Sequence, residues 1–470
     1  MILSHTFSVT VDAIMHGGLT RFMEGNHKRR FRTVAGMDRM SNLPQHLIGL
    51  ILERLPIQDA VRTSILSKTW RYIWTTMTLL VFDKKFSQYT EISKTFGCDG
   101  SIRIINHVLI LHNGPISKFS LHIPLIYGYS TSFHEVDQTM LLISRKSVQE
   151  LALTNSNRCY ELPSCVSSCS ELRKLELEKC IFKPLLKFEV FSNLEDLRLN
   201  MIDFGQYSCG SLVTLPKLRK LVLEECKNVY NFNIKASQLI GLVVLPCHDA
   251  MLSRLLDSPH LILVSLCMLR DFVRVERINL TWLLSNLSKI NNLSMDGNDT
   301  KFNVIYNLGS FSNEALFPFP FLDELPKWLP RPVDSLRLLR LRSCQLSDLD
   351  QLDGALCLLR NSPNLETLYM SLRKPLHYDV EEKIASDHLE SPDCLDQTLN
   401  RLRIVKILTF DGSRSSLLFI KLLLAHSPSL KKLTIHTSRT SVAYESLNIV
   451  MRFPQASPKA KLSFFIPKPN

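Results

Sequence analysis

The sequence lacks a long run of apolar residues. A helix that crosses a bilayer needs roughly 20 consecutive, mostly apolar residues. The stretch 261–269 (LILVSLCML) is about half that length, and it predicts a buried strand or helix. The first 20 residues also lack the uninterrupted apolar core of a secretory signal. We therefore expect a soluble chain of the nucleus, the cytoplasm or both, with no membrane partner.

This location decides how the cysteines and the glycosylation sequons are interpreted. The 12 cysteines are expected to be reduced and to pack as small hydrophobes, because disulfides rarely persist in the cytosol or nucleus. The sequons matter only in the secretory pathway, and they begin at Asn279, Asn286, Asn292 and Asn298.

Signatures of catalysis are missing as well. The sequence contains no G-x-S-x-G turn, no Walker-type phosphate loop and no H-E-x-x-H motif. The cysteines at 159, 165 and 169 lack zinc-module spacing, and no paired C-x-x-C accompanies them. The sequence thus predicts a protein that is not an enzyme, with no metal site and no cofactor.

The net charge of +12 permits acidic partners, but basic residues are not gathered into one dominant stripe. Acidic residues are interleaved with them along most of the chain. A nucleic-acid surface normally clusters basic residues with aromatic ones, so we expect no nucleic-acid partner. Residues 1–36 are predicted to be a flexible extension. The basic run at 27–32 lies within it and is expected to be a solvated tail or, under a second hypothesis, an aid to nuclear import.

Residues 38–74 carry the start, stop and face signals of three short helices. Asn42 and Pro44 suit an N-cap and a first helical turn. From there Leu47, Ile48, Ile51 and Leu55 form an apolar stripe. The stripe ends at Pro56, because proline cannot continue the hydrogen-bond ladder.

Two further helices are expected, over 59–66 and, after a Ser67 cap, around Trp70 and Trp74. Three such helices cannot bury this many large apolar side chains among themselves. Part of that surface therefore needs a partner.

The segment resembles an F-box of the kind common in plants. The matching positions are Asp38, Arg39, Ser41, Leu43, Pro44, Ile51, Leu52, Leu55, Pro56, Asp59, Ala60, Val61, Arg62, Thr63, Ser64, Leu66, Ser67, Trp70, Arg71 and Trp74. Gln45, His46 and Thr69 depart from the pattern at peripheral positions. The resemblance implies docking onto a Skp1-type adaptor, and through it a cullin, in a ubiquitin ligase. The implied adaptor-binding residues are Leu43, Pro44, Ile48, Ile51, Leu55, Pro56, Val61, Leu66, Trp70 and Trp74.

From about residue 115 a leucine phrase recurs, as in LRKLELEKC at 172–180 and LRKLVLEEC at 218–226. Its central leucines, Leu151, Leu175, Leu197, Leu221 and Leu242, are 24, 22, 24 and 21 residues apart. This period predicts a leucine-rich-repeat solenoid. A single turn cannot bury its own leucines, so neighbouring turns share one core.

The alternation of a strand separates a buried face from an exposed face in each repeat. Leucines two residues apart point into the core, and the residue between them points out. Exposed target-binding candidates are Glu176, Arg198, Val222 and Arg340. Cys180, Cys226 and Cys344 follow strands, and they predict turn residues that pack inward rather than metal ligands.

The end of the chain resembles the FBD domain of plant F-box proteins. The matching residues are Ser427, Pro428, Leu430, Phe453, Ala456, Ser457, Pro458 and Ala460. The predicted domains are an extension (1–36), an F-box (37–84), leucine-rich repeats (115–370) and an FBD-like unit (395–466). The expected fold class is α/β, with an all-α module ahead of a solenoid.

Two functions remain open from the sequence. In the first, the chain is the target-recognition subunit of a Skp1–cullin–F-box ligase, with its repeats holding an unidentified target protein. In the second, it is an interaction scaffold that presents no target. The sequons leave a third alternative, a fragment of an extracellular leucine-rich-repeat receptor, which the missing signal disfavours.

Overall fold

The computed structural model divides the chain into two compact units, Met1–Leu218 with Cys226–Ala236 and Arg219–Glu225 with Ser237–Asn470. It describes residues 43–66, 68–92, 100–125, 133–157, 160–182, 191–205, 213–229, 234–245, 258, 260–267, 290–296, 329, 332–373, 380–391, 394–395, 398–437 and 440–465. The 1–36 extension, the Asn42 and Ser67 caps and the sequons at Asn279, Asn286 and Asn298 lie outside these ranges. No helix among the described residues has the length and apolar character to cross a membrane.

The first unit begins with a small helical module. Its elements are α2 (Gln45–Leu52), α3 (Ile57–Arg62) and the 3-10 turns η1 (Thr63–Ile65) and η2 (Ile73–Thr76). Pro44 and Pro56 each stand directly before a helix, where a missing N–H leaves no helical bond unmade. The prediction of a third α-helix is wrong. Tyr72 (φ −118°, ψ 0°) leaves the helical region, so only the single turn η2 follows it.

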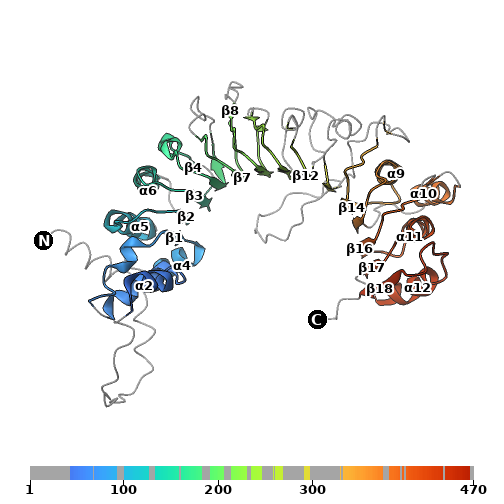
Figure 1. The fold of residues 1–470 in the computed structure, drawn as a ribbon, viewed down its shortest axis with the longest axis horizontal. Coiled ribbons are helices and arrows are strands. Elements are labelled where there is room, and N and C mark those ends of the chain that lie inside the picture. The colour runs from blue at the N-terminus through green and yellow to red at the C-terminus, as the bar shows by residue number, and fades with distance from the viewer. Residues whose placement is uncertain are drawn as a thin grey trace, which may run out of the picture. The chain divides into compact units, whose positions relative to one another are not determined.

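A parallel stack of strands follows in the same unit (Figure 1). Its order is β1 (Leu79–Phe82), β2 (Lys118–Ile123), β3 (Glu150–Asn155), β5 (Lys174–Glu178) and β7 (Asp196–Asn200). Helices α4 (Lys84–Ile92), α5 (Gly100–Leu111) and α6 (His134–Ser144) and the turn η3 (Ser164–Ser168) connect the early strands. Short pairs join β4 (Tyr160–Glu161) to β6 (Cys180–Ile181) and β8 (Val213–Thr214) to β10 (Ile234–Lys235).

The second unit is a parallel stack of the same kind. Its order is β9 (Lys220–Glu224), β11 (Gly241–Val244), β12 (Leu263–Cys267), β13 (Asn292–Asp296), β14 (Leu338–Cys344), β15 (Thr367–Leu372), β16 (Ile404–Phe410), β17 (Lys432–Thr437) and β18 (Lys461–Phe465). Helices α9 (Leu349–Arg360), α10 (Val380–Glu390), α11 (Arg414–His426) and α12 (Thr440–Val450) accompany its later strands. In Figure 1, α9 to α11 lie on one side of β14 to β17 and leave the opposite side, the open face, uncovered.

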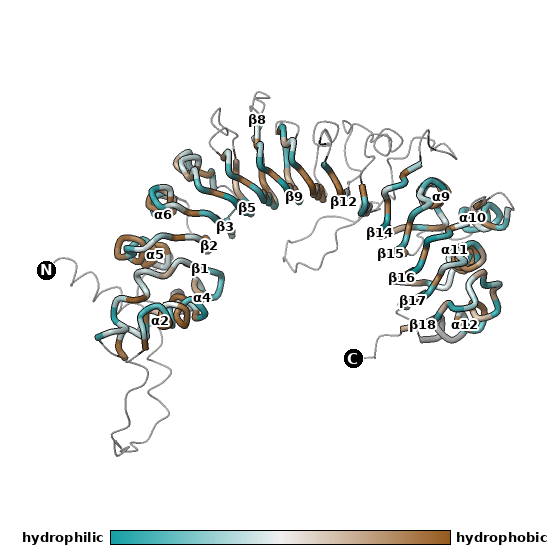
Figure 2. The backbone as a smooth tube through the Cα atoms, in the orientation of Figure 1, coloured by the Kyte–Doolittle hydropathy of each residue, from teal (hydrophilic) through white to brown (hydrophobic). Residues whose placement is uncertain are grey.

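The predicted leucine core is confirmed in both units. Leu151, Leu175 and Leu197 stand opposite one another in register, and each is at most 1% exposed. In the second unit Leu221 pairs with Leu242 in the same way. Residues between the leucines are half-buried on the open face, as the alternating colours along the strands in Figure 2 illustrate. Burial of alternate side chains by stacked turns is the packing that a solenoid requires.

The FBD-like residues belong to this stack rather than to a separate body, because β15 pairs with β16 and the ladder runs on to β18. One of their serines, Ser457, joins its turn to the previous one. The buried Ser457 Oγ donates to the carbonyl of Leu430 at 2.7 Å. Ser258, which also precedes a proline, donates to the carbonyl of Leu239 at 3.0 Å. Ser457 and Ser258 therefore satisfy buried backbone carbonyls between turns. The hydroxyl of Ser427, which also precedes a proline, is buried without a hydrogen-bond partner among the described residues.

Candidate functional site: the helical module and the open strand faces

The helical module has a closed core of its own. Ile48, Leu52, Val61 and Trp74 are fully buried, and Trp70 is 2% exposed. In α2 the buried Ile48 and Leu52 are four residues apart, which places them on one side of the helix. The module's fold thus accounts for one apolar stripe of the sequence.

A second apolar stripe remains on the outside. Leu47, Leu50 and Ile51 recur at i, i+3 and i+4 along α2, and Leu50 is 58% exposed. Ile65 and Leu66, after α3, are 64% and 63% exposed. We call these five residues the apolar face. These exposed aliphatic side chains make the module a candidate protein-interaction surface.

The ten implied adaptor-binding residues therefore separate into two groups. Four of them, Ile48, Val61, Trp70 and Trp74, are buried in the core of the module and stabilise its fold. Pro44, Ile51, Leu55, Pro56 and Leu66 are exposed, and Leu43 is half-buried. The sequence list omitted Leu47, Leu50 and Ile65, although Leu47 stood in the recognised stripe and Ile65 is adjacent to Leu66.

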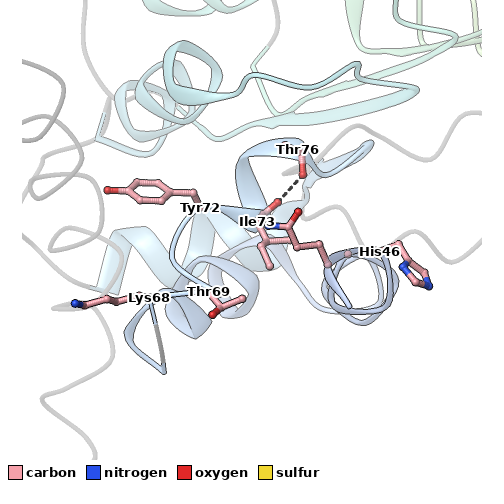
Figure 3. Close-up of a pocket in the computed structure, with 8 residues that line it drawn as sticks. His46, Lys68, Thr69, Tyr72, Ile73 and Thr76 are labelled. Atoms are coloured by element: carbon pink, nitrogen blue, oxygen red, sulfur yellow. Dashed lines mark hydrogen bonds between the residues drawn. The ribbon is translucent and has the colours of Figure 1, made fainter. Parts of the chain in front are cut away.

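A hollow of about 490 Å³ opens beside α2. Figure 3 shows its lining, which comes from α2 and from the segment around η2. The lining residues are Gln45, His46, Gly49, Lys68, Thr69, Tyr72, Ile73 and Thr76. The F-box departures Gln45, His46 and Thr69 all lie here, so they change the chemistry of one hollow and leave the apolar face intact.

Hydrogen bonds join the module to the strand stack without an intervening linker. The Glu53 carboxylate accepts from the Thr78 hydroxyl at 2.6 Å and from the Thr78 backbone N–H at 3.3 Å. The carbonyl of Thr75 accepts from the backbone N–H groups of Asn113 (2.9 Å) and Gly114 (3.3 Å). Strand β1 begins at Leu79, directly after these contacts. The module and the first strands thus form one hydrogen-bonded body.

The open face of the first unit balances its charges locally. Glu176 and Arg198, two of the target-binding candidates, stand opposite each other on β5 and β7. Glu176 lies 3.7 Å from Lys174, and Arg198 lies 3.3 Å from Asp196. These side chains are therefore partly committed to neighbours within the same face.

The open face of the second unit differs in chemistry. Val222 and Arg340 are half-buried on it, as expected. The Arg340 guanidinium lies 5.4 Å from the centroid of the Tyr369 ring, within cation–π range. His436 stacks on Phe465 with centroids 5.0 Å apart. Tyr369, His436 and Phe465 are not among the target-binding candidates from the sequence, although the strand alternation places each at an outward position.

The cysteines that follow strands pack inward, as predicted. Cys180, Cys226 and Cys344 are at most 2% exposed, and burial raises the pKa of Cys180 and Cys344 to about 12. The thiols of Cys180 and Cys344 are therefore neutral near pH 7 and are poor nucleophiles and ligands. Among the described residues, no group of three or more His, Cys, Asp or Glu side chains is placed to hold a metal.

Comparisons with known proteins match both parts of the chain. The family model for the F-box domain covers residues 40–82, and the model described as "At1g61320/AtMIF1, LRR domain" covers residues 108–456. The F-box/FBD/LRR-repeat protein At1g13570 of Arabidopsis thaliana is 32% identical over 91% of this chain and 98% of its own length. The probable FBD-associated F-box protein At1g32375 of the same plant is 24% identical over 91% of this chain and 100% of its own.

Among solved structures, an internalin (inlF) from Listeria monocytogenes covers 78% of this chain and 88% of its own, with a TM-score of 0.33 and 13% identity. An F-box generally binds a Skp1-type adaptor, and F-box/LRR proteins are generally non-catalytic adaptors. By its two domain matches and its full-length relative, this chain belongs to the F-box/FBD/LRR-repeat proteins.

Proposed function

We propose that this chain is the target-recognition subunit of a Skp1–cullin–F-box ubiquitin ligase, acting in the nucleus, the cytoplasm or both. The helical module docks the adaptor, and the open faces of the strands hold a target protein. Chemistry takes place on other subunits, and this chain supplies proximity.

The observation that carries the proposal is the apolar face. Leu50, Ile65 and Leu66 are each more than half exposed, although the module beneath them already has a complete core. Burying one such side chain completely against a partner contributes about 1.5–3 kcal/mol of binding free energy. We assign direct adaptor contact to the apolar face together with Pro44, Leu55 and Pro56, and a positioning role to the buried tryptophans.

Co-expression of the full chain with a Skp1-type adaptor tests this assignment. Leu50→Asp/Leu66→Asp should abolish co-purification, because both charges would be buried at the interface. Val380→Asp is a matched control, since Val380 is an exposed aliphatic residue of α10 in the second unit. Equal recovery of the adaptor with parent and double variant would remove the docking assignment.

A cellular arm separates a ligase subunit from a scaffold. Proteins that accumulate when the chain is absent should fall again when the parent chain is restored, but not when the double variant is. A scaffold would bind the same proteins without changing their abundance or ubiquitination. That outcome would favour the scaffold over the ligase subunit.

A further inference from the structure

The last five strands of the second unit present an open face without carboxylates. The sequences of β14 to β18 contain no Asp or Glu, and together they carry two arginines, three lysines and a histidine. The strands β2 to β7 of the first unit carry Glu150, Glu161, Glu176, Glu178 and Asp196 beside Lys118, Lys174 and Arg198. Acidic and basic side chains are therefore mixed on the strands of the first unit, whereas β14 to β18 carry basic side chains without acidic ones.

Register brings the key side chains of β14 to β18 together. Arg340, Tyr369, Lys406 and Thr434 stand opposite one another on successive strands, and His436 stands opposite Phe465 in the same ladder. We call these six residues the basic–aromatic strip. Neighbouring strands are about 4.8 Å apart, so Arg340 and Lys406 are separated by about 10 Å.

Within the described part of the chain, the salt bridges beside the strip do not involve its two cations. Glu366, directly before β15, lies 3.9 Å from Arg337 and 3.8 Å from Arg403, outside the strip. Among the described residues, no salt bridge joins Arg340 or Lys406 to a carboxylate. Burial, followed by the charge of Lys406, lowers the pKa of His436, which shows that the lysine's field reaches the aromatic pair.

Apolar surface accompanies this charge. Tyr369 is held under the Arg340 guanidinium, and Phe465 is 49% exposed beside His436. Aromatic side chains next to cations that form no salt bridge with the described residues suit a ligand that carries both carboxylates and a large apolar side chain. A peptide in the extended polyproline II conformation has three residues per turn and advances about 3.1 Å per residue. Carboxylates three residues apart then lie on one side of the peptide, about 9 Å apart, close to the Arg340–Lys406 separation.

We propose that the basic–aromatic strip binds an extended acidic segment of the target protein. Carboxylates of the segment pair with Arg340 and Lys406, and an apolar side chain between them packs on Tyr369 or Phe465. The inference deepens the proposed function, on which it rests for calling the ligand a target, but the strip's binding does not require the adaptor.

Fluorescence anisotropy with the full chain tests the proposal. The probe is a labelled peptide Glu-Ser-Phe-Glu-Ser-Leu-Glu, whose glutamates recur at every third residue. Arg340→Glu/Lys406→Glu should weaken its binding by at least about tenfold and should create binding to the same peptide with Lys in place of Glu. Lys174→Glu, on the open face of the first unit, should bind the acidic peptide within about twofold of the parent.

Further measurements test which class of ligand binds and whether the variants are still folded. The peptide with Gln in place of Glu should bind at least about tenfold more weakly than the acidic one. Arg340→Gln/Lys406→Gln provides a second variant with less risk to the fold, and each variant must keep the parent's thermal unfolding temperature. Equal binding by parent and variants, or tighter binding of single-stranded DNA or heparin than of the acidic peptide, would overturn the proposal.

Adaptor binding is measured on the same preparations. Loss of peptide binding with the adaptor interaction intact in every variant is the expected result. No peptide binding by a parent chain that still binds the adaptor would refute the strip alone. Peptide binding by a parent chain that never binds the adaptor would refute the proposed function alone.

Discussion

Replacing Leu66 with alanine should weaken adaptor binding without affecting folding. Leu66 is 63% exposed, so most of its apolar surface is not buried by folding and can be buried by a partner. Complete burial of a leucine contributes about 1.5–3 kcal/mol, and the exposed share corresponds to about 1–2 kcal/mol. Because about 1.4 kcal/mol is a tenfold change in Kd, we expect binding roughly 5- to 30-fold weaker.

The matched variant is Trp74→Ala, in the core of the same module. Trp74 is fully buried, so its truncation should destabilise the module by about 3–5 kcal/mol. Trp74→Phe is milder, since the indole Nε1 has no hydrogen-bond partner among the described residues. Leu66→Ala should change stability by less than about 0.5 kcal/mol, as expected for a surface position.

Isothermal titration calorimetry with a purified Skp1-type adaptor gives Kd, and thermal unfolding gives stability. Two results would refute the reasoning. One is Leu66→Ala binding the adaptor within twofold of the parent, and the other is a loss of unfolding temperature in Leu66→Ala as large as that in Trp74→Ala.

Two further predictions concern stability. Burial is the main cause that lowers the pKa of His112 and His122, so the folded state favours their neutral rings. The free energy of unfolding should therefore be highest above about pH 6.5, the pKa of an unfolded histidine, and should fall as the pH drops from there toward the lowered pKa values of the folded state. Urea unfolding near neutral and at mildly acidic pH should show this decline, and His112→Gln should reduce it; a pH-independent midpoint would contradict it. Gly114→Ala should destabilise by about 1–3 kcal/mol, because a Cβ would meet the backbone Cα of Thr76 at 3.0 Å. At Gly49, in helix α2, an added Cβ would have no atom within 4 Å, so Gly49→Ala should stabilise the fold by about 0.5–1 kcal/mol. Calorimetry that finds Gly114→Ala stabilising and Gly49→Ala destabilising would contradict both predictions.

Much of the fold follows from the sequence because its signals are local and repeated. The alternation of leucines with polar residues around Leu175 and Leu197 predicts their strands. Pro44 predicts the start of a helix and Pro56 the end of one, and each stands directly before a helix. The third helix was mispredicted because the spacing of Trp70 and Trp74 is compatible with a helix or with turns. Only the packing of both indoles decides between them.

The candidate surfaces were less predictable, for a physical reason. Leu47 and Ile48 are adjacent and equally apolar, and the sequence does not say which one faces the module's core and which faces a partner. The basic–aromatic strip is harder still. Arg340 and Tyr369 are 29 residues apart in sequence, and Tyr369 and Lys406 are 37 apart. Their proximity depends on strand register across a helix and loops in each interval.

The hydrogen-bonded joint between Glu53 and Thr78 bears on how a bound target would be presented. Two modules on a flexible tether meet with a probability set by the tether's length. Here the docking module continues directly into β1, so the first strands turn with it as one piece. A target held on those strands would keep a fixed orientation relative to the helical module, whereas a flexible tether would allow many orientations. Insertion of residues at this joint would then alter which lysines are modified, even where both binding affinities are unchanged.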